Sequence, residues 1–218
     1  MHLRPLASLL ALPLLAACAP ELHSTVSVSN IGRVATTGQP AEATAQLRIP
    51  QPGAAECAAN LQTLVSRLET LAPIASEPRC VSVGFDTFAE LRTPLAIVPF
   101  GAKPEHRLAA IVALPTNSGA TDLAFRLLQP FGDIFHTVAA DISPRPRLDP
   151  SIIAVTLCND GDEPLTLLAG GEVVVNGKAA PPEIALAAGE IAEFRLTATA
   201  AGLIESGTGY TFASFRRQ

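Results

Sequence analysis

Histidine and acidic side chains are the residues of this sequence best suited to acid–base or metal chemistry, and they are widely spaced. His23, His106 and His136 form no pattern such as His-Glu-x-x-His, which places two imidazoles toward a zinc ion. Asp86 lies among aromatic and apolar neighbours and has no partner base beside it in sequence. A hydrolase site assembled from Asp86, His106 and His136 is the least favoured hypothesis, and the sequence predicts no catalytic residue, no metal ligand and no cofactor.

The run Asn159-Asp160-Gly161-Asp162 gathers amide and carboxylate oxygens, the ligands that calcium prefers. It lacks the downstream bidentate glutamate of an EF-hand loop, so a hairpin turn is the favoured interpretation. Gly207-Thr208-Gly209 is too short to indicate phosphate binding and is also expected to be a turn. The sequence contains no P-loop, no dinucleotide fingerprint and no Gly-x-Ser-x-Gly motif.

Three cysteines, Cys57, Cys80 and Cys158, lie beyond the N-terminal region. Cys57 and Cys80 are separated by 22 residues, and in an oxidising compartment such a pair is expected to form a disulfide. Cys158 is left over in an apolar segment. Because no basic or histidine residue adjoins Cys158, a buried structural thiol is favoured over a reactive one.

Residues 1–17 have the layout of a secretory signal peptide. Arg4 precedes an apolar stretch from Leu6 to Ala17. This stretch is shorter than the roughly 20 residues that a membrane-spanning helix needs. The sequence therefore predicts export, with residues 1–17 removed.

The stretch ends in Leu15-Ala16-Ala17-Cys18, which resembles the lipobox of bacterial lipoproteins. In that family cleavage occurs before the cysteine, whose sulfur is diacylated and whose new amine is usually acylated as well. The resemblance implies lipidation of Cys18, and two or more acyl chains make attachment effectively permanent. Ala19, in place of aspartate, implies sorting to the outer membrane, facing the periplasm. The alternative is an ordinary secretory peptide in which Cys18 is a bystander.

The composition excludes several classes of partner. The chain is 48% hydrophobic, enough for a real core. Loss of residues 1–17 removes Arg4 and leaves 14 basic and 20 acidic side chains, a net charge near −6. This balance gives no electrostatic reason to bind nucleic acid. With no tryptophan and one tyrosine, the chain is also poor in side chains that stack on sugars or bases, and no small-molecule substrate is indicated.

Apolar periodicity predicts helices and strands in the first half of the mature chain. Apolar residues at spacings of three and four predict a helix over 55–72, which Pro73 ends. A second, short helix is expected over 121–129. The predicted strands and buried segments are 22–29, 45–49, 81–86, 94–100 and 107–114.

Three prolines among residues 143–150 predict an extended linker. The segments predicted to be strands after it are 151–158, 164–168, 191–199 and 210–215, with a hairpin turn at Asn176-Gly177. The sequence thus predicts an α+β protein. A lipid-anchored helix-on-sheet domain over 18–142 is followed by the Pro-rich linker 143–150 and a small β-sandwich-like domain over 151–218.

Several of these features together resemble a family of uncharacterised lipoproteins encoded by bacteriophages and prophages. The resemblance spans most of the mature chain, its motifs are short and structural, and it implies no known activity. The motifs are the lipobox ending in Cys18, Val26-Ser27-Val28-Ser29, the pair Cys57 and Cys80, Phe85-Asp86-Thr87-Phe88-Ala89 followed by Pro94, Asn159-Asp160, and Val175-Asn176-Gly177.

Besides the hypothesis of a hydrolase, the sequence supports two hypotheses about function. The favoured one is a non-catalytic interaction module of the bacterial envelope, held on the membrane by acyl chains on Cys18 and binding another envelope protein. It rests on the anchor, the small β domain and the missing catalytic motifs. The alternative, which rests on the family resemblance alone, is a prophage-derived factor that excludes superinfecting phages.

Overall fold

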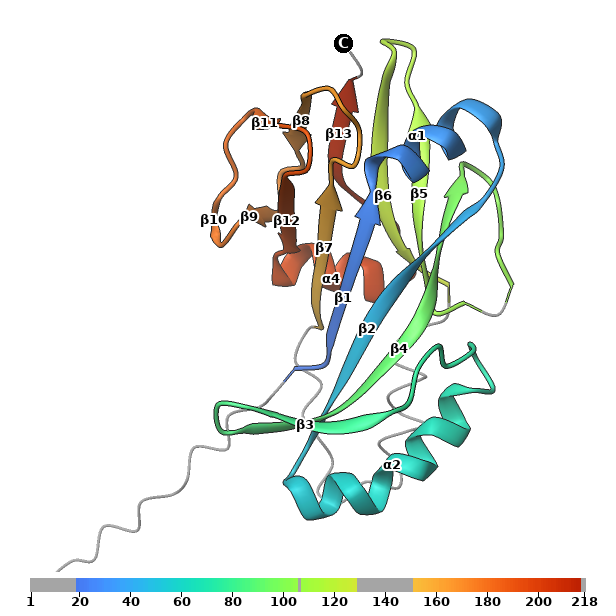
Figure 1. Cartoon of the computed structure of the whole chain (residues 1–218), viewed down its shortest axis with the longest axis vertical. Coiled ribbons are helices and arrows are strands. Elements are labelled where there is room, and N and C mark those ends of the chain that lie inside the picture. The colour runs from blue at the N-terminus through green and yellow to red at the C-terminus, as the bar shows by residue number, and fades with distance from the viewer. Residues whose placement is uncertain (1–18, 106, 129–150, 217–218) are drawn as a thin grey trace, which may run out of the picture.

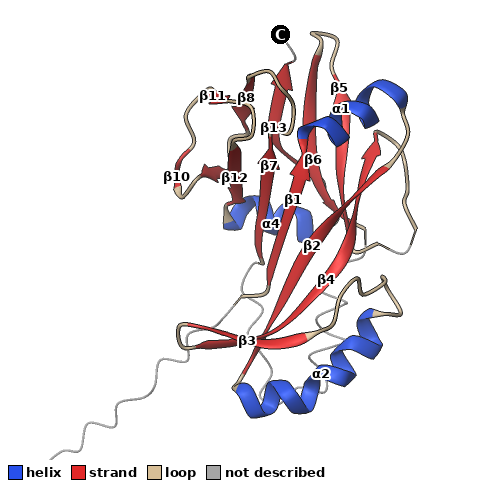
Figure 2. Ribbon diagram, viewed as in Figure 1, coloured by secondary structure: helices blue, strands red, loops and turns tan. Residues whose placement is uncertain are grey.

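The structure is a computed structural model that describes residues 19–105, 107–128 and 151–216. It is an α+β protein in which strands predominate (Figures 1 and 2). The helices are α1 (Val28–Thr37), α2 (Ala54–Leu68) and α4 (Ala198–Glu205). The strands are β1 (Glu21–Ser27), β2 (Ala41–Gln51), β3 (Arg79–Val83), β4 (Asp86–Pro99), β5 (Ala109–Pro115), β6 (Ala120–Leu127), β7 (Ile152–Cys158), β8 (Leu165–Ala169), β9 (Val173–Val175), β10 (Lys178–Ala179), β11 (Ile184–Leu186), β12 (Ile191–Leu196) and β13 (Tyr210–Arg216).

All described strands belong to one sheet, in the order β10-β9-β12-β7-β1-β2-β4-β5-β6-β13-β8-β11, with β3 paired to β4. The pairs β1–β7 and β4–β5 are parallel, and the others are antiparallel. The segments on either side of 143–150 meet in this sheet, because β7 pairs with β1 and β13 pairs with β6. The two expected domains therefore share one sheet, while residues 143–150 themselves lie outside the described residues.

The sheet curls around the main core, which brings strands that are distant in its order face to face. Phe194 on β12 and Phe212 on β13 are fully buried, with ring centroids 5.7 Å apart in an edge-to-face arrangement. Helix α4 contacts strands β6, β7, β12 and β13, and α1 contacts β1, β2, β4 and β5. The side chains of Ile31 and Val34 anchor α1 to this core.

Helix α2 confirms the helix expected over 55–72, although it ends at Leu68. Its buried stripe of Cys57, Leu64, Val65 and Leu68 faces strands β2, β3 and β4. The first turn is also fixed covalently, because Cys57 and Cys80 are joined in a disulfide with Cα atoms 6.0 Å apart. The disulfide therefore ties α2 to β3.

Two other local predictions agree with the structure. Residues 107–114 were expected to form a central strand, and β5 lies between β4 and β6 with its first five residues buried. The expected turn at Asn176-Gly177 joins β9 to β10. Both residues have positive φ, 49° and 73°, as this two-residue hairpin turn requires.

The helix predicted over 121–129 is wrong, because residues 120–127 form strand β6. Leu123, Phe125 and Leu127 are buried at every second position, which is the period of a strand. Pairing of β6 with both β5 and β13 outweighs the helix-start signal at Thr121 and Asp122.

Two predicted strands are too long because a helix begins inside them. The strand expected over 22–29 ends at Ser27, whose hydroxyl accepts a hydrogen bond from the Asn30 amide and caps α1. The strand expected over 191–199 ends at Leu196, and Thr197 caps α4 in the same way.

A third predicted strand, over 81–86, also ends early. Gly84 adopts a positive φ of 64° and turns the chain into β4.

Candidate functional site

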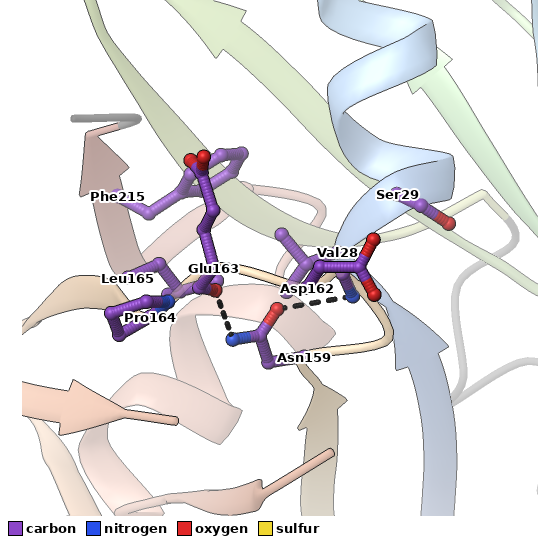
Figure 3. A pocket seen from close by; sticks show the side chains of 9 residues that line it. Val28, Ser29, Asn159, Asp162, Glu163, Pro164, Leu165 and Phe215 are labelled. Carbon is purple, nitrogen blue, oxygen red and sulfur yellow. Dashed lines mark hydrogen bonds between the residues drawn. The ribbon is translucent and has the colours of Figure 1, made fainter. Parts of the chain in front are cut away.

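A pocket of about 370 Å³ lies where α1 begins, beside the loop that follows β7 (Figure 3). Residues from three separate parts of the chain line it. They are Val28, Ser29, Asn159, Gly161, Asp162, Glu163, Pro164, Leu165 and Phe215. Figure 3 shows the carboxylates of Asp162 and Glu163 pointing to different sides, so these two acids do not converge on a common point.

Asn159 and Asp160 hold this loop in place. The buried Asn159 amide donates to the carbonyls of Glu163 and Leu186, at 2.9 and 3.0 Å, and its oxygen accepts from the Gly161 amide. The Asp160 carboxylate accepts hydrogen bonds from the Ser29 amide, at 2.9 Å, and from the Ser29 hydroxyl. It thereby adds a negative charge to the N-terminus of α1, where the helix dipole favours one.

The electrostatics of Asp160 agree with this structural role. Burial raises the pKa of Asp160, but the hydrogen bonds from Ser29 outweigh burial and leave that pKa below its usual value. Within residues 19–105, 107–128 and 151–216, no three His, Cys, Asp or Glu side chains are grouped to hold a metal ion. The run 159–162 thus forms a turn that caps α1. The expected hairpin turn is wrong, because the strands on either side do not pair: β7 pairs with β1 and β12, and β8 pairs with β11 and β13.

A second cluster of polar side chains forms a charge ladder across four strands. The ladder consists of Glu21, Arg48, Glu90 and Arg79, which are directly opposite one another in the register of β1, β2, β4 and β3. Along each strand these residues alternate with residues of the hydrophobic core. They therefore lie on the face of the sheet that points away from the main core. His23 joins the end of the ladder through a contact of 3.1 Å between Nε2 and Glu21 Oε2.

Each carboxylate of the ladder is bound by arginine. Arg48 donates from Nη1 to Glu21 Oε2 at 3.1 Å and from Nε to Glu90 Oε2 at 3.0 Å. Arg79 donates from Nε to the other oxygen of Glu90 at 2.9 Å. Because both Glu90 oxygens are occupied, this buried acid is suited to fixing the register of the strands rather than to proton transfer.

The pKa values of both ladder acids are lowered. For Glu21 the largest cause is the hydrogen bond from His23, which together with Arg48 outweighs burial. For Glu90 burial raises the pKa, and the hydrogen bonds from Arg79 and Arg48 more than reverse that effect. Both groups are therefore held in the charged form.

We expect Glu90→Ala to destabilise the protein by about 2 kcal/mol at neutral pH, because it leaves Arg48 and Arg79 without their shared acid. The value is below that of a fully buried pair, since Arg48 keeps Glu21 and Arg79 is largely exposed. Urea unfolding followed by circular dichroism measures it. As the control, Glu42→Ala removes an exposed acid that binds Arg107, and we expect a change within about 0.5 kcal/mol.

The stability difference between the wild type and Glu90→Ala is expected to depend on pH. A lowered pKa in the folded state means that the charged Glu90 stabilises the fold above the pKa of the unfolded chain. This stabilisation is lost as the pH falls through the folded-state value. The stability difference between wild type and Glu90→Ala should therefore shrink on acidification, and a constant difference would contradict the assigned role.

The structure places the remaining residues singled out in the sequence as follows. Asp86 is the half-buried first residue of β4, whereas His106 and His136 lie outside the described residues, as does Cys18. Cys158 is a free thiol at the end of β7, and it is half-buried rather than buried as the sequence predicts. The charge ladder was missed because its members pair across 11 to 42 positions of the sequence, and only strand register brings them together.

Comparison with family models, with curated proteins and with solved structures gave no match for this chain. Within the described residues, no helix has both the length and the apolar character needed to cross a membrane.

Proposed function

We propose that this chain is a lipoprotein of the bacterial envelope, anchored through acyl chains on Cys18 to the outer membrane and facing the periplasm. The exported part acts as a non-catalytic module that binds another envelope protein. The lipobox-like sequence Leu15-Ala16-Ala17-Cys18 and the following Ala19 support the anchor.

The observation that carries the proposal is the disulfide between Cys57 and Cys80. Disulfides persist in oxidising compartments such as the periplasm, which is where a lipobox would direct the chain. The anchor would also be short, because Cys18 precedes the first residue of β1, Glu21, by three positions. Three residues span at most about 10 Å, so the sheet would stay close to the bilayer.

Open sheet edges support the binding of a protein partner. Among the strands that the structure describes, β3 pairs with β4 alone, and β10 and β11 end the sheet. β3 is the longest of these three edges, with five residues from Arg79 to Val83. An extended peptide can add to such an edge through main-chain hydrogen bonds.

The anchor is tested by metabolic labelling with a palmitate analogue, comparing wild type with Cys18→Ser and then fractionating the cells. We expect the wild type to carry label and to sediment with membranes. We expect the Cys18→Ser variant to lose essentially all label, since its hydroxyl cannot replace the acylated sulfur. An unlabelled wild type that is released in soluble form would rule out the anchor. Cross-linking in native envelopes that recovers no protein would count against the binding module.

A further inference from the structure

The hairpin between β3 and β4 carries an exposed apolar tip, formed by Val83 and Phe85. Val83 is 49% exposed, and the side chain of Phe85 is fully exposed. Gly84 between them has a φ of 64° and makes the turn. A phenylalanine held in water at the tip of a hairpin forgoes a large gain from burial, which indicates a surface that contacts something apolar.

Strand register places this apolar tip at the same end of the sheet as the start of β1, the strand that follows the proposed anchor in sequence. Glu21, Arg48 and Glu90 are directly opposite one another on β1, β2 and β4. Both β1 and β4 are antiparallel to β2, so they run in the same direction. Cys18 precedes Glu21 by three positions, and Phe85 precedes Glu90 by five. The chain therefore enters β1 at the end of the sheet from which the hairpin extends, and Figure 1 shows the hairpin and the start of β1 toward the same end of the sheet.

We propose that the apolar tip inserts into the interface of the bilayer as a second membrane contact next to the lipid anchor. This inference rests on the proposed lipidation of Cys18. Two apolar side chains on one turn are too small a contact for a stable protein interface, which buries about 1,200 Å² or more. They suit the boundary between headgroups and acyl chains, where aromatic side chains are favoured.

The flanking residues fit this position. Ser82 and Thr87 are polar and uncharged, and they pair with each other across the hairpin. The nearest charged residue is Asp86, which follows Phe85 and lies directly opposite Val83 in the register of the hairpin. Insertion therefore extends only to the level of Val83 and Asp86, with Phe85 reaching furthest and the Asp86 carboxylate at the headgroups. The anchor alone would let the protein rotate freely about its tether, whereas anchor and tip together would restrict its orientation to rotation about the line that joins them.

The absence of tryptophan from the whole chain allows a direct test. Phe85→Trp gives a protein with a single tryptophan at the tip. Phe100→Trp is the matched control, because Phe100 is also exposed in a turn but follows the other end of β4. The strand between them has a length of about 45 Å along its path. Both full-length variants are purified with their lipids and placed in vesicles of phosphatidylethanolamine and phosphatidylglycerol with brominated acyl chains.

We expect the tryptophan of Phe85→Trp to show blue-shifted emission and strong quenching by the brominated chains, and that of Phe100→Trp to show neither. Equal quenching of the two variants, in a preparation that carries the palmitate label, would overturn the inference and leave the proposed anchor intact. A preparation without label would overturn the anchor itself, and with it this second contact.

Discussion

Replacing Phe194 by alanine is expected to destabilise the protein by about 4 kcal/mol. Phe194 is fully buried and meets Phe212 edge to face across the curl of the sheet. The loss combines the burial of the ring, the cavity left behind and the aromatic contact. Equilibrium urea unfolding of the unlipidated Cys18→Ser protein, followed by circular dichroism, measures this change.

The control for this variant is Phe100→Ala, which removes a ring that is 76% exposed. We expect the free energy of unfolding to change by less than about 0.5 kcal/mol there. Phe212→Ala and the double variant complete a cycle, in which the two rings should couple by about 1 kcal/mol. Independent effects of the two substitutions would show that β12 and β13 do not pack against each other, and hence that the sheet does not curl as described.

Removing the disulfide is expected to have the second largest effect. The double variant Cys57→Ala and Cys80→Ala should lose about 3 kcal/mol of stability, because the unfolded chain regains the freedom of an open loop. Reduction of the wild type with dithiothreitol should produce a similar loss. The same unfolding measurement, with and without reductant, provides both values.

Cys158→Ala is the matched control for this experiment. Cys158 is a free thiol and only half-buried, so we expect its removal to cost less than about 1 kcal/mol. Its stability should respond to reductant as the wild type does. A wild type whose stability is unchanged by reductant would contradict the disulfide and would also weaken the argument for an oxidising compartment.

Local patterns predicted the elements that have a strong signal of their own. The apolar stripe of α2 repeats at helical spacing, and Asn176-Gly177 supplies the two positive φ angles of its turn. The nearly continuous apolar run before Pro115 marks β5 as a strand buried on both faces. In each case the residues that decide the structure are neighbours in sequence.

The predictions that depended on distant segments were the wrong or incomplete ones. Thr121 and Asp122 resemble a helix start and favour a helix, whereas β5 and β13 pair with this segment from both sides and make it strand β6. Helix α4 was missed because its alanine-rich segment follows β12 with no break in hydrophobicity. The charge ladder and the cap that Asp160 places on α1 likewise join residues that only the folded sheet brings together.

The place of β1 within the sheet has a consequence for the order of folding during export. β1 is the first of the described strands, yet one of its two neighbours is β7, some 130 positions later. On the proposed route to the envelope, β1 would expose an unpaired edge, open to pairing with other chains, until β7 had crossed the inner membrane. Folding would then be slow relative to secretion, and a periplasmic chaperone that shields the open edge would raise the yield of native protein.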